Sequence, residues 1–174
     1  MGLLLYNKDM SKVYIAFFGC GKTTFCKKHV NWVDLDISFY VPFRDQKALH
    51  NLLYFYLKWD YNLLLCSSPS GNRILQTYLS LPENSWQKQT FPINVILPSP
   101  EMKDEILQRV MNRSGAIGSE INFITSTYDT TWQALDTMPF DTKVYLKPGQ
   151  YVSDIIDDEG NYKPNVEIIY PNKC

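Results

Sequence analysis

Short apolar runs alternate along the chain with segments of helical spacing. The apolar runs predict buried strands over residues 12–18, 32–36, 61–66, 93–97 and 142–146. The segments of helical character cover residues 22–29, 45–58, 72–81, 99–112, 120–138 and 150–157. Strands that alternate with helices are typical of a parallel sheet with crossover helices, so the pattern predicts an α/β fold.

The segment 99–112 has the clearest helix start. Ser99 is expected to cap it, Pro100 suits the first helical position, and Glu101 and Asp104 add negative charge to the first turn. The pattern over residues 120–138 leaves a break near Asp129 open.

Length and composition indicate one small globular unit. The 174 residues predict a single domain with its core over about residues 12–156 and an irregular tail over 158–174. A net charge of −1 gives no basic footprint for nucleic acid or a membrane surface. The four cysteines lack metal-site spacing, and no apolar run reaches the length of a membrane span, so we expect a reducing, cytoplasmic setting.

The first apolar run leads into the phosphate-binding pattern of a P-loop, Ala16-Phe-Phe-Gly-Cys-Gly-Lys-Thr23. Ala16 stands where the first glycine is usual, whereas Gly19 and Gly21 keep the tight turn accessible. Phosphate would bind to the backbone N–H groups of the loop, the Lys22 amine and the start of the following helix. The Thr23 hydroxyl would bind Mg²⁺. The predicted cofactor-binding residues are Phe18, Gly19, Cys20, Gly21, Lys22, Thr23 and Thr24.

Two carboxylates close the second strand. Asp34 and Asp36 lie two residues apart, so on a strand they face the same side. Either could position Mg²⁺ or accept a proton from an attacking hydroxyl, and Asp36 is preferred as the metal and catalytic residue because it is nearer the strand end. The alternative is that one of them caps local structure. Cys66 ends the third strand without an acidic residue behind it, so no Walker B aspartate is visible.

Arginines supply the remaining candidate chemistry. Arg109 and Arg113 lie four residues apart, hence on one helix face, just before the glycine-containing segment 114–118. They are predicted to act as catalytic residues on a lid that neutralises a transferring phosphoryl group. The alternative is a solvated face on which Glu105 pairs with Arg109.

Further candidate residues lie in and after the second and third strands. The predicted substrate-binding residues are Asp34, Asp36, Phe39, Arg44 and Arg73. Phe39, Tyr40 and Trp59 could stack on a base, although aromatic residues at such places more often belong to the core, as Trp132 is expected to do.

The order of these segments resembles that in small phage-encoded P-loop nucleotide kinases, which are similar to adenylate kinase-like and shikimate kinase-like enzymes. The resemblance covers about residues 12–156, and only the P-loop is a specific motif. It implies a three-layer P-loop NTPase fold with a five-stranded parallel sheet and helices on both faces. It further implies ATP as donor, Mg²⁺, an arginine-bearing lid, and an acceptor pocket over the second and third strands. The segments that carry it are residues 19–24, 33–39, 65–73 and 104–113.

We therefore expect an ATP-dependent phosphotransferase whose acceptor is a nucleoside monophosphate or a deoxynucleotide. No Asp-Arg-Ser or Asp-Arg-Tyr triplet and no Asn-Lys-x-Asp motif is present, so the acceptor stays undefined. One alternative is a kinase that acts on a modified base or an end within DNA, which the near-neutral charge disfavours. Another is a nucleotide-binding regulator without catalysis.

Overall fold

The computed structural model describes residues 12–36, 46–66, 92–113, 115 and 117–171, and the predicted helix 72–81 lies outside these ranges. The strands are β1 (Val13–Ala16), β2 (Trp32–Asp36), β3 (Asn62–Cys66), β4 (Asn94–Pro98) and β5 (Thr142–Leu146). The helices are α1 (Lys22–Lys28), α2 (Gln46–Lys58), α4 (Lys103–Met111), α5 (Gly118–Asp136) and α6 (Val152–Ile155), with a 3₁₀ turn at Pro100–Met102 before α4.

The strands form one parallel sheet in the order β2-β3-β1-β4-β5. The central strand β1 pairs Ile15 with Leu65 of β3 on one side and with Val95 of β4 on the other. The connection after β1 runs toward β2, and the connection after β4 runs the other way, toward β5. The two connections therefore diverge between the adjacent strands β1 and β4. Such a divergence is the place where open α/β sheets bind ligands, at the carboxyl ends of the strands.

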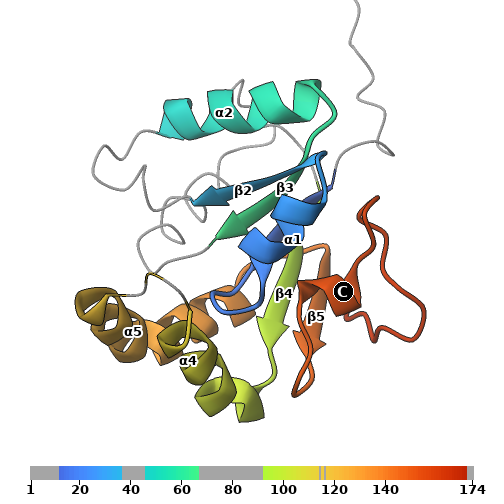
Figure 1. Cartoon of the computed structure of the whole chain (residues 1–174). Helices are drawn as coiled ribbons and strands as arrows, with labels where there is room; N and C mark the ends of the chain where they lie inside the picture. The colour runs from blue at the N-terminus through green and yellow to red at the C-terminus, as the bar shows by residue number, and fades with distance from the viewer. Residues whose placement is uncertain (1–11, 37–45, 67–91, 114, 116, 172–174) are drawn as a thin grey trace, which may run out of the picture.

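Helices cover both faces of the sheet, which gives the α/β architecture that the alternating pattern predicted (Figure 1). On one face Phe25 of α1 packs edge-on against Trp32, with ring centroids 5.1 Å apart. On the other, Tyr128 of α5 packs against Phe17, with centroids 5.0 Å apart. The α2 connection crosses the sheet in the direction opposite to that of α1, so right-handed crossovers place these two helices on opposite faces.

The core lies on the central strands. Every residue of β1 is buried, and so are Leu63, Leu64 and Leu65 of β3. Strands that are buried on both faces require continuous apolar runs, which is why these segments show no polar alternation.

The segment after α6 wraps back along the sheet. The Tyr14 hydroxyl donates to the Gly160 carbonyl (2.9 Å), and the Trp32 indole N–H donates to the Asp158 carbonyl (2.7 Å). Lys143 and Ile169 exchange two backbone hydrogen bonds of 2.8 Å, so the tail pairs antiparallel with β5 at the sheet edge. The irregular tail predicted from the sequence is thus part of the fold.

Several predicted boundaries shift. α5 begins at Gly118 and continues through Asp129 without a break, and α6 spans only Val152–Ile155 of the predicted 150–157. Ser99 stands at the predicted cap position, but its side chain makes no capping hydrogen bond.

No helix in the described part of the chain has both the length and the apolar character needed to cross a membrane.

Candidate functional site

The 17–21 loop lies between β1 and α1, at the carboxyl end of the central strand and beside β4. Gly19 and Gly21 both adopt positive φ, +73° and +88°, which a side chain would make costly. A Cβ on Gly19 would lie 3.0 Å from Cγ2 of Ile106, so α4 approaches the loop closely. Ala16 lies in β1 and is not among the described residues with positive φ, so a glycine is not required there.

The carbonyl groups of the loop turn toward the protein. Those of Ala16, Phe17, Gly19, Cys20 and Gly21 all accept hydrogen bonds from side chains or backbone N–H groups. The Phe17 N–H donates to the Ile96 carbonyl of β4 (3.1 Å), whereas the N–H groups of residues 18–22 donate to no carbonyl or side chain among the described residues. Successive N–H groups left without a partner before a helix form a site for an anion.

Lys22 begins α1 and lies beneath this loop. Its side chain is 6% exposed, and its amine donates to the carbonyls of Ala16 (3.0 Å) and Phe17 (2.7 Å). Two carbonyl acceptors offset the cost of burying an ammonium group. Burial raises the pKa of the neighbouring Cys66 thiol, which ends β3, and the charge of Lys22 opposes that rise.

The next residue brings a hydroxyl to the second strand. The Thr23 hydroxyl donates to Oδ2 of Asp34, and both side chains are solvent-accessible. Asp36 pairs with Cys66 across the β2–β3 register. The sequence favoured Asp36 as the partner of Thr23 at the metal, whereas the Thr23 hydroxyl donates to Asp34.

The Thr23 and Asp34 oxygens suit a hard cation. Mg²⁺ is commonly held by one or two carboxylates together with substrate phosphates, rather than by a full set of protein ligands. The described residues include no cluster of three or more histidine, cysteine, aspartate or glutamate side chains that could hold a metal ion. When bound here, Mg²⁺ would neutralise charge on phosphate oxygens.

Arg109 reaches from α4 to the loop. Its Nη1 donates to the carbonyls of Gln150 (2.9 Å) and Gly19 (3.4 Å), and its Nη2 pairs with Glu105. The side chain is only 11% exposed, because the guanidinium also lies 3.8 Å from the centroid of the Tyr151 ring. Arg109 is therefore integrated into the wall of the site, and its pairing with Glu105 is the one that the alternative interpretation expected.

Arg113 does not share these contacts. Its guanidinium pairs with Glu120 at the start of α5, and its side chain is 48% exposed. The two arginines therefore engage different partners, one at the loop and one across the α4–α5 connection. Their joint action on a transferring group remains a prediction.

The connector after β5 completes the wall of the site, and no local pattern in the sequence predicted it. The Val152 N–H donates to the Cys20 carbonyl (2.9 Å), and the Gly149 N–H donates to the Glu105 carboxylate (3.1 and 3.2 Å). Tyr151 packs against Gly21 from the same connector. An approach of this kind depends on a turn far along the chain, which no local pattern announces.

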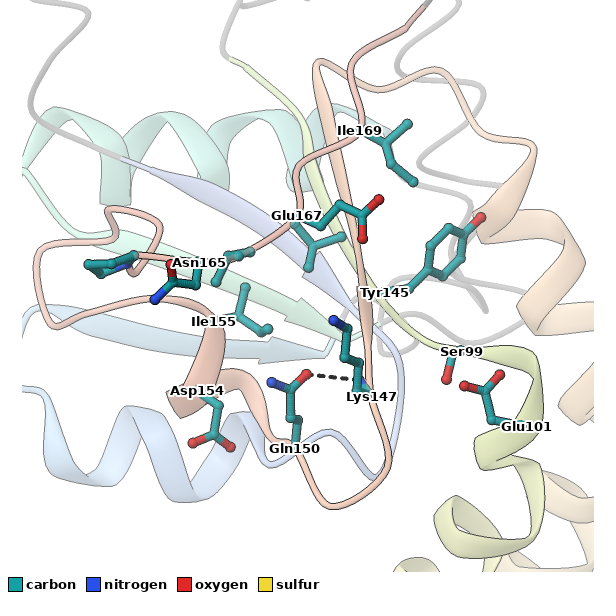
Figure 2. Close-up of a pocket in the computed structure, with 13 residues that line it drawn as sticks. Ser99, Glu101, Tyr145, Lys147, Gln150, Asp154, Ile155, Asn165, Glu167 and Ile169 are labelled. Atoms are coloured by element: carbon teal, nitrogen blue, oxygen red, sulfur yellow. Dashed lines mark hydrogen bonds between the residues drawn. The ribbon is translucent and has the colours of Figure 1, made fainter.

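A cavity of about 340 Å³ lies on the other side of this connector, against β5, α6 and the tail (Figure 2). The Gln150 side chain accepts a hydrogen bond from the Lys147 N–H (2.8 Å), which fixes the connector from within (Figure 2). Glu101, Lys147 and Glu167 contribute charge to the cavity lining, and the 17–21 loop contributes no residue to it.

The remaining predicted residues fall into two groups. Trp132, predicted as a core residue, is half-buried against the core, where it packs on Tyr145 and donates its indole N–H to the Pro98 carbonyl (2.8 Å). Trp59 is 65% exposed and precedes the amino end of β3, opposite the edge that holds the loop. Phe39, Tyr40, Arg44 and Arg73 lie outside the described residues.

The Cys20 thiol, which lies in the loop, is buried. Burial raises the pKa of Cys20 to about 12, although Lys22 and Arg109 act in the opposite direction. At neutral pH the thiol is therefore protonated and a poor nucleophile.

Comparison with known proteins assigns no family to the chain. No protein-family model matches it, and no curated protein matches it.

Proposed function

We propose that the protein is an ATP-dependent phosphotransferase that acts on a nucleotide-type acceptor. The observation that carries the proposal is the loop after β1, whose carbonyls accept hydrogen bonds from the protein and whose N–H groups at residues 18–22 have no acceptor among the described residues. A loop of this form at the start of a helix favours phosphate, and Lys22 places a positive charge directly beside it.

The neighbouring oxygens support a Mg²⁺-bound nucleotide. We infer that Thr23 and Asp34 hold the cation, because their side chains already meet, and that Asp36 acts nearer the acceptor. Phosphoryl transfer requires mainly positioning and charge neutralisation, and these side chains with a bound cation would supply both.

The acceptor is inferred from the resemblance to small nucleotide kinases, and a nucleoside monophosphate or deoxynucleotide is preferred. Acceptors within DNA are disfavoured because the net charge of −1 supplies no broad basic surface. The free thiols of Cys20, Cys26 and Cys66 support a reducing, cytoplasmic setting for this activity.

A second candidate is a nucleotide-binding regulator without turnover. The observation that favours it is Cys66, which stands at the carboxyl end of β3 beside Lys22, where an acidic residue is common in P-loop ATPases. Such a protein would bind ATP and leave it intact.

Turnover with defined acceptors separates the two. The full chain would be incubated with ATP, Mg²⁺ and, separately, nucleosides, nucleoside monophosphates, deoxynucleotides and short DNA. We expect ADP and a mass gain of one phosphate on a nucleotide acceptor. ATP that is bound but never consumed with any acceptor would favour the regulator.

A further inference from the structure

We propose that Tyr151 is a positioning residue that holds the 17–22 loop in its phosphate-binding form, with Arg109 fixing the tyrosine ring. This inference rests on the proposed function, because the loop is taken to bind the phosphates of a nucleotide. It adds the β5–α6 connector to the parts of the chain that determine nucleotide affinity.

The Tyr151 ring contacts the loop at Gly21, the residue whose conformation is most constrained. A Cβ on Gly21 would lie 3.0 Å from Cδ1 of Tyr151 and 3.5 Å from its Cβ, so the ring abuts the glycine backbone. Gly21 has φ +88° and precedes the first residue of α1. The ring therefore limits the movement of the peptide that leads into Lys22.

Arg109 lies over the face of the same ring. Its guanidinium carbon lies 3.8 Å from the ring centroid, which is a cation–π contact. The same guanidinium donates to the Gly19 carbonyl, so ring and guanidinium together span the loop from Gly21 to Gly19. The ion pair with Glu105 fixes the guanidinium to α4.

Hydrogen bonds also hold the backbone at Tyr151 and at the next residue, Val152. The Tyr151 N–H donates to Oδ2 of Asp154 (2.8 Å), and the Val152 N–H donates to the Cys20 carbonyl (2.9 Å). Tyr151 is nevertheless 42% exposed, so its ring contributes little to the core. Its removal should change the order of the loop more than the stability of the fold.

A loop with two glycines has many conformations in which its N–H groups do not converge. If the Tyr151 ring restricts these conformations, a bound nucleotide gains affinity because less ordering remains to be done. Loss of the ring should raise the Kd for nucleotide while kcat at saturating ATP changes much less.

The test compares Tyr151→Ala with Tyr151→Phe, which keeps the ring, and with Tyr170→Ala, which removes an exposed tyrosine from the tail. Titration calorimetry with Mg·ADP should give a Kd about tenfold higher for Tyr151→Ala. Tyr151→Phe and Tyr170→Ala should bind like the wild type. Hydrogen exchange without nucleotide should be faster at the amides of residues 18–22 in Tyr151→Ala alone.

Two results would overturn the proposal: a wild-type Kd and unchanged loop exchange in Tyr151→Ala, or an equal loss of affinity in Tyr151→Phe. The second result would mean that the hydroxyl acts, and not the ring. Failure of the proposed function would show differently, as a wild-type protein that binds no Mg·ADP. The exchange measurement on the free protein would then still decide whether Tyr151 orders the loop.

Discussion

Single side chains at this site act mainly through backbone groups. Lys22 and Arg109 both donate to carbonyls of the loop, and these contacts hold its backbone in place. Asp34 differs, because its partner is the Thr23 hydroxyl and both side chains are accessible to solvent. We therefore propose Asp34 as the strand carboxylate that shares a cation with Thr23.

The two carboxylates can be separated by matched substitutions. Asp34→Asn should lower kcat about a hundredfold and raise the Mg²⁺ concentration needed for half-maximal rate, because the amide lacks the charge that positions Mg²⁺. Asp36→Asn should change this Mg²⁺ concentration less than Asp34→Asn does. Initial rates over a Mg²⁺ titration measure both. A Mg²⁺ dependence altered only in Asp36→Asn would contradict the role given to Asp34.

The helices and strands followed from the sequence more fully than the connections between them. The runs that became β2 and β5 have the predicted bounds, although these two edge strands carry polar residues and are only partly buried. Residues 150–157 were predicted as one helix, but only Val152–Ile155 is helical, since the chain turns to bring Ile156 against Tyr162. The P-loop could be predicted because its glycines are local, whereas the Tyr151 contact depends on a turn elsewhere in the chain.

The contact between the loop and the β5–α6 connector also predicts a stability difference between two glycines. Gly21→Ala and Gly149→Ala both place a side chain at positive φ, +88° and +83°. Only the Cβ at Gly21 would meet a neighbour, Cδ1 of Tyr151 at 3.0 Å. Gly21→Ala should therefore reduce the free energy of unfolding by about 1 kcal/mol more than Gly149→Ala does. Urea denaturation measures the difference, and equal losses would contradict the close approach.

At the scale of the whole molecule, the tail joins parts of the sheet that are distant in sequence. It accepts hydrogen bonds from Tyr14 and Trp32 near the amino ends of β1 and β2, and it pairs with β5 at the edge. An edge strand that is covered in this way has fewer free backbone groups to pair with another chain. The tail had no recognisable pattern because its contacts are isolated bridges and hydrogen bonds and not a continuous helix or strand.

The edge pairing can be tested at Ile169. Ile169→Pro removes the N–H that donates to the Lys143 carbonyl (2.8 Å), whereas Ile169→Ala keeps it. The proline variant should lose about 1–3 kcal/mol of stability beyond the loss in the alanine variant. Thermal unfolding would measure this loss, and light scattering would report any association through the uncovered edge. Equal melting temperatures for the two variants would show that the pairing contributes nothing.

The most direct test of the central claim is nucleotide binding to the loop after β1. Titration calorimetry with Mg·ADP should detect binding to the wild type and a large loss, about a hundredfold or more in Kd, for Lys22→Ala. Lys28→Ala is the matched control, because Lys28 is an exposed lysine in the last turn of the same helix, and it should bind like the wild type. Equal affinity in Lys22→Ala and the wild type, or no binding in any of the three proteins, would contradict the account.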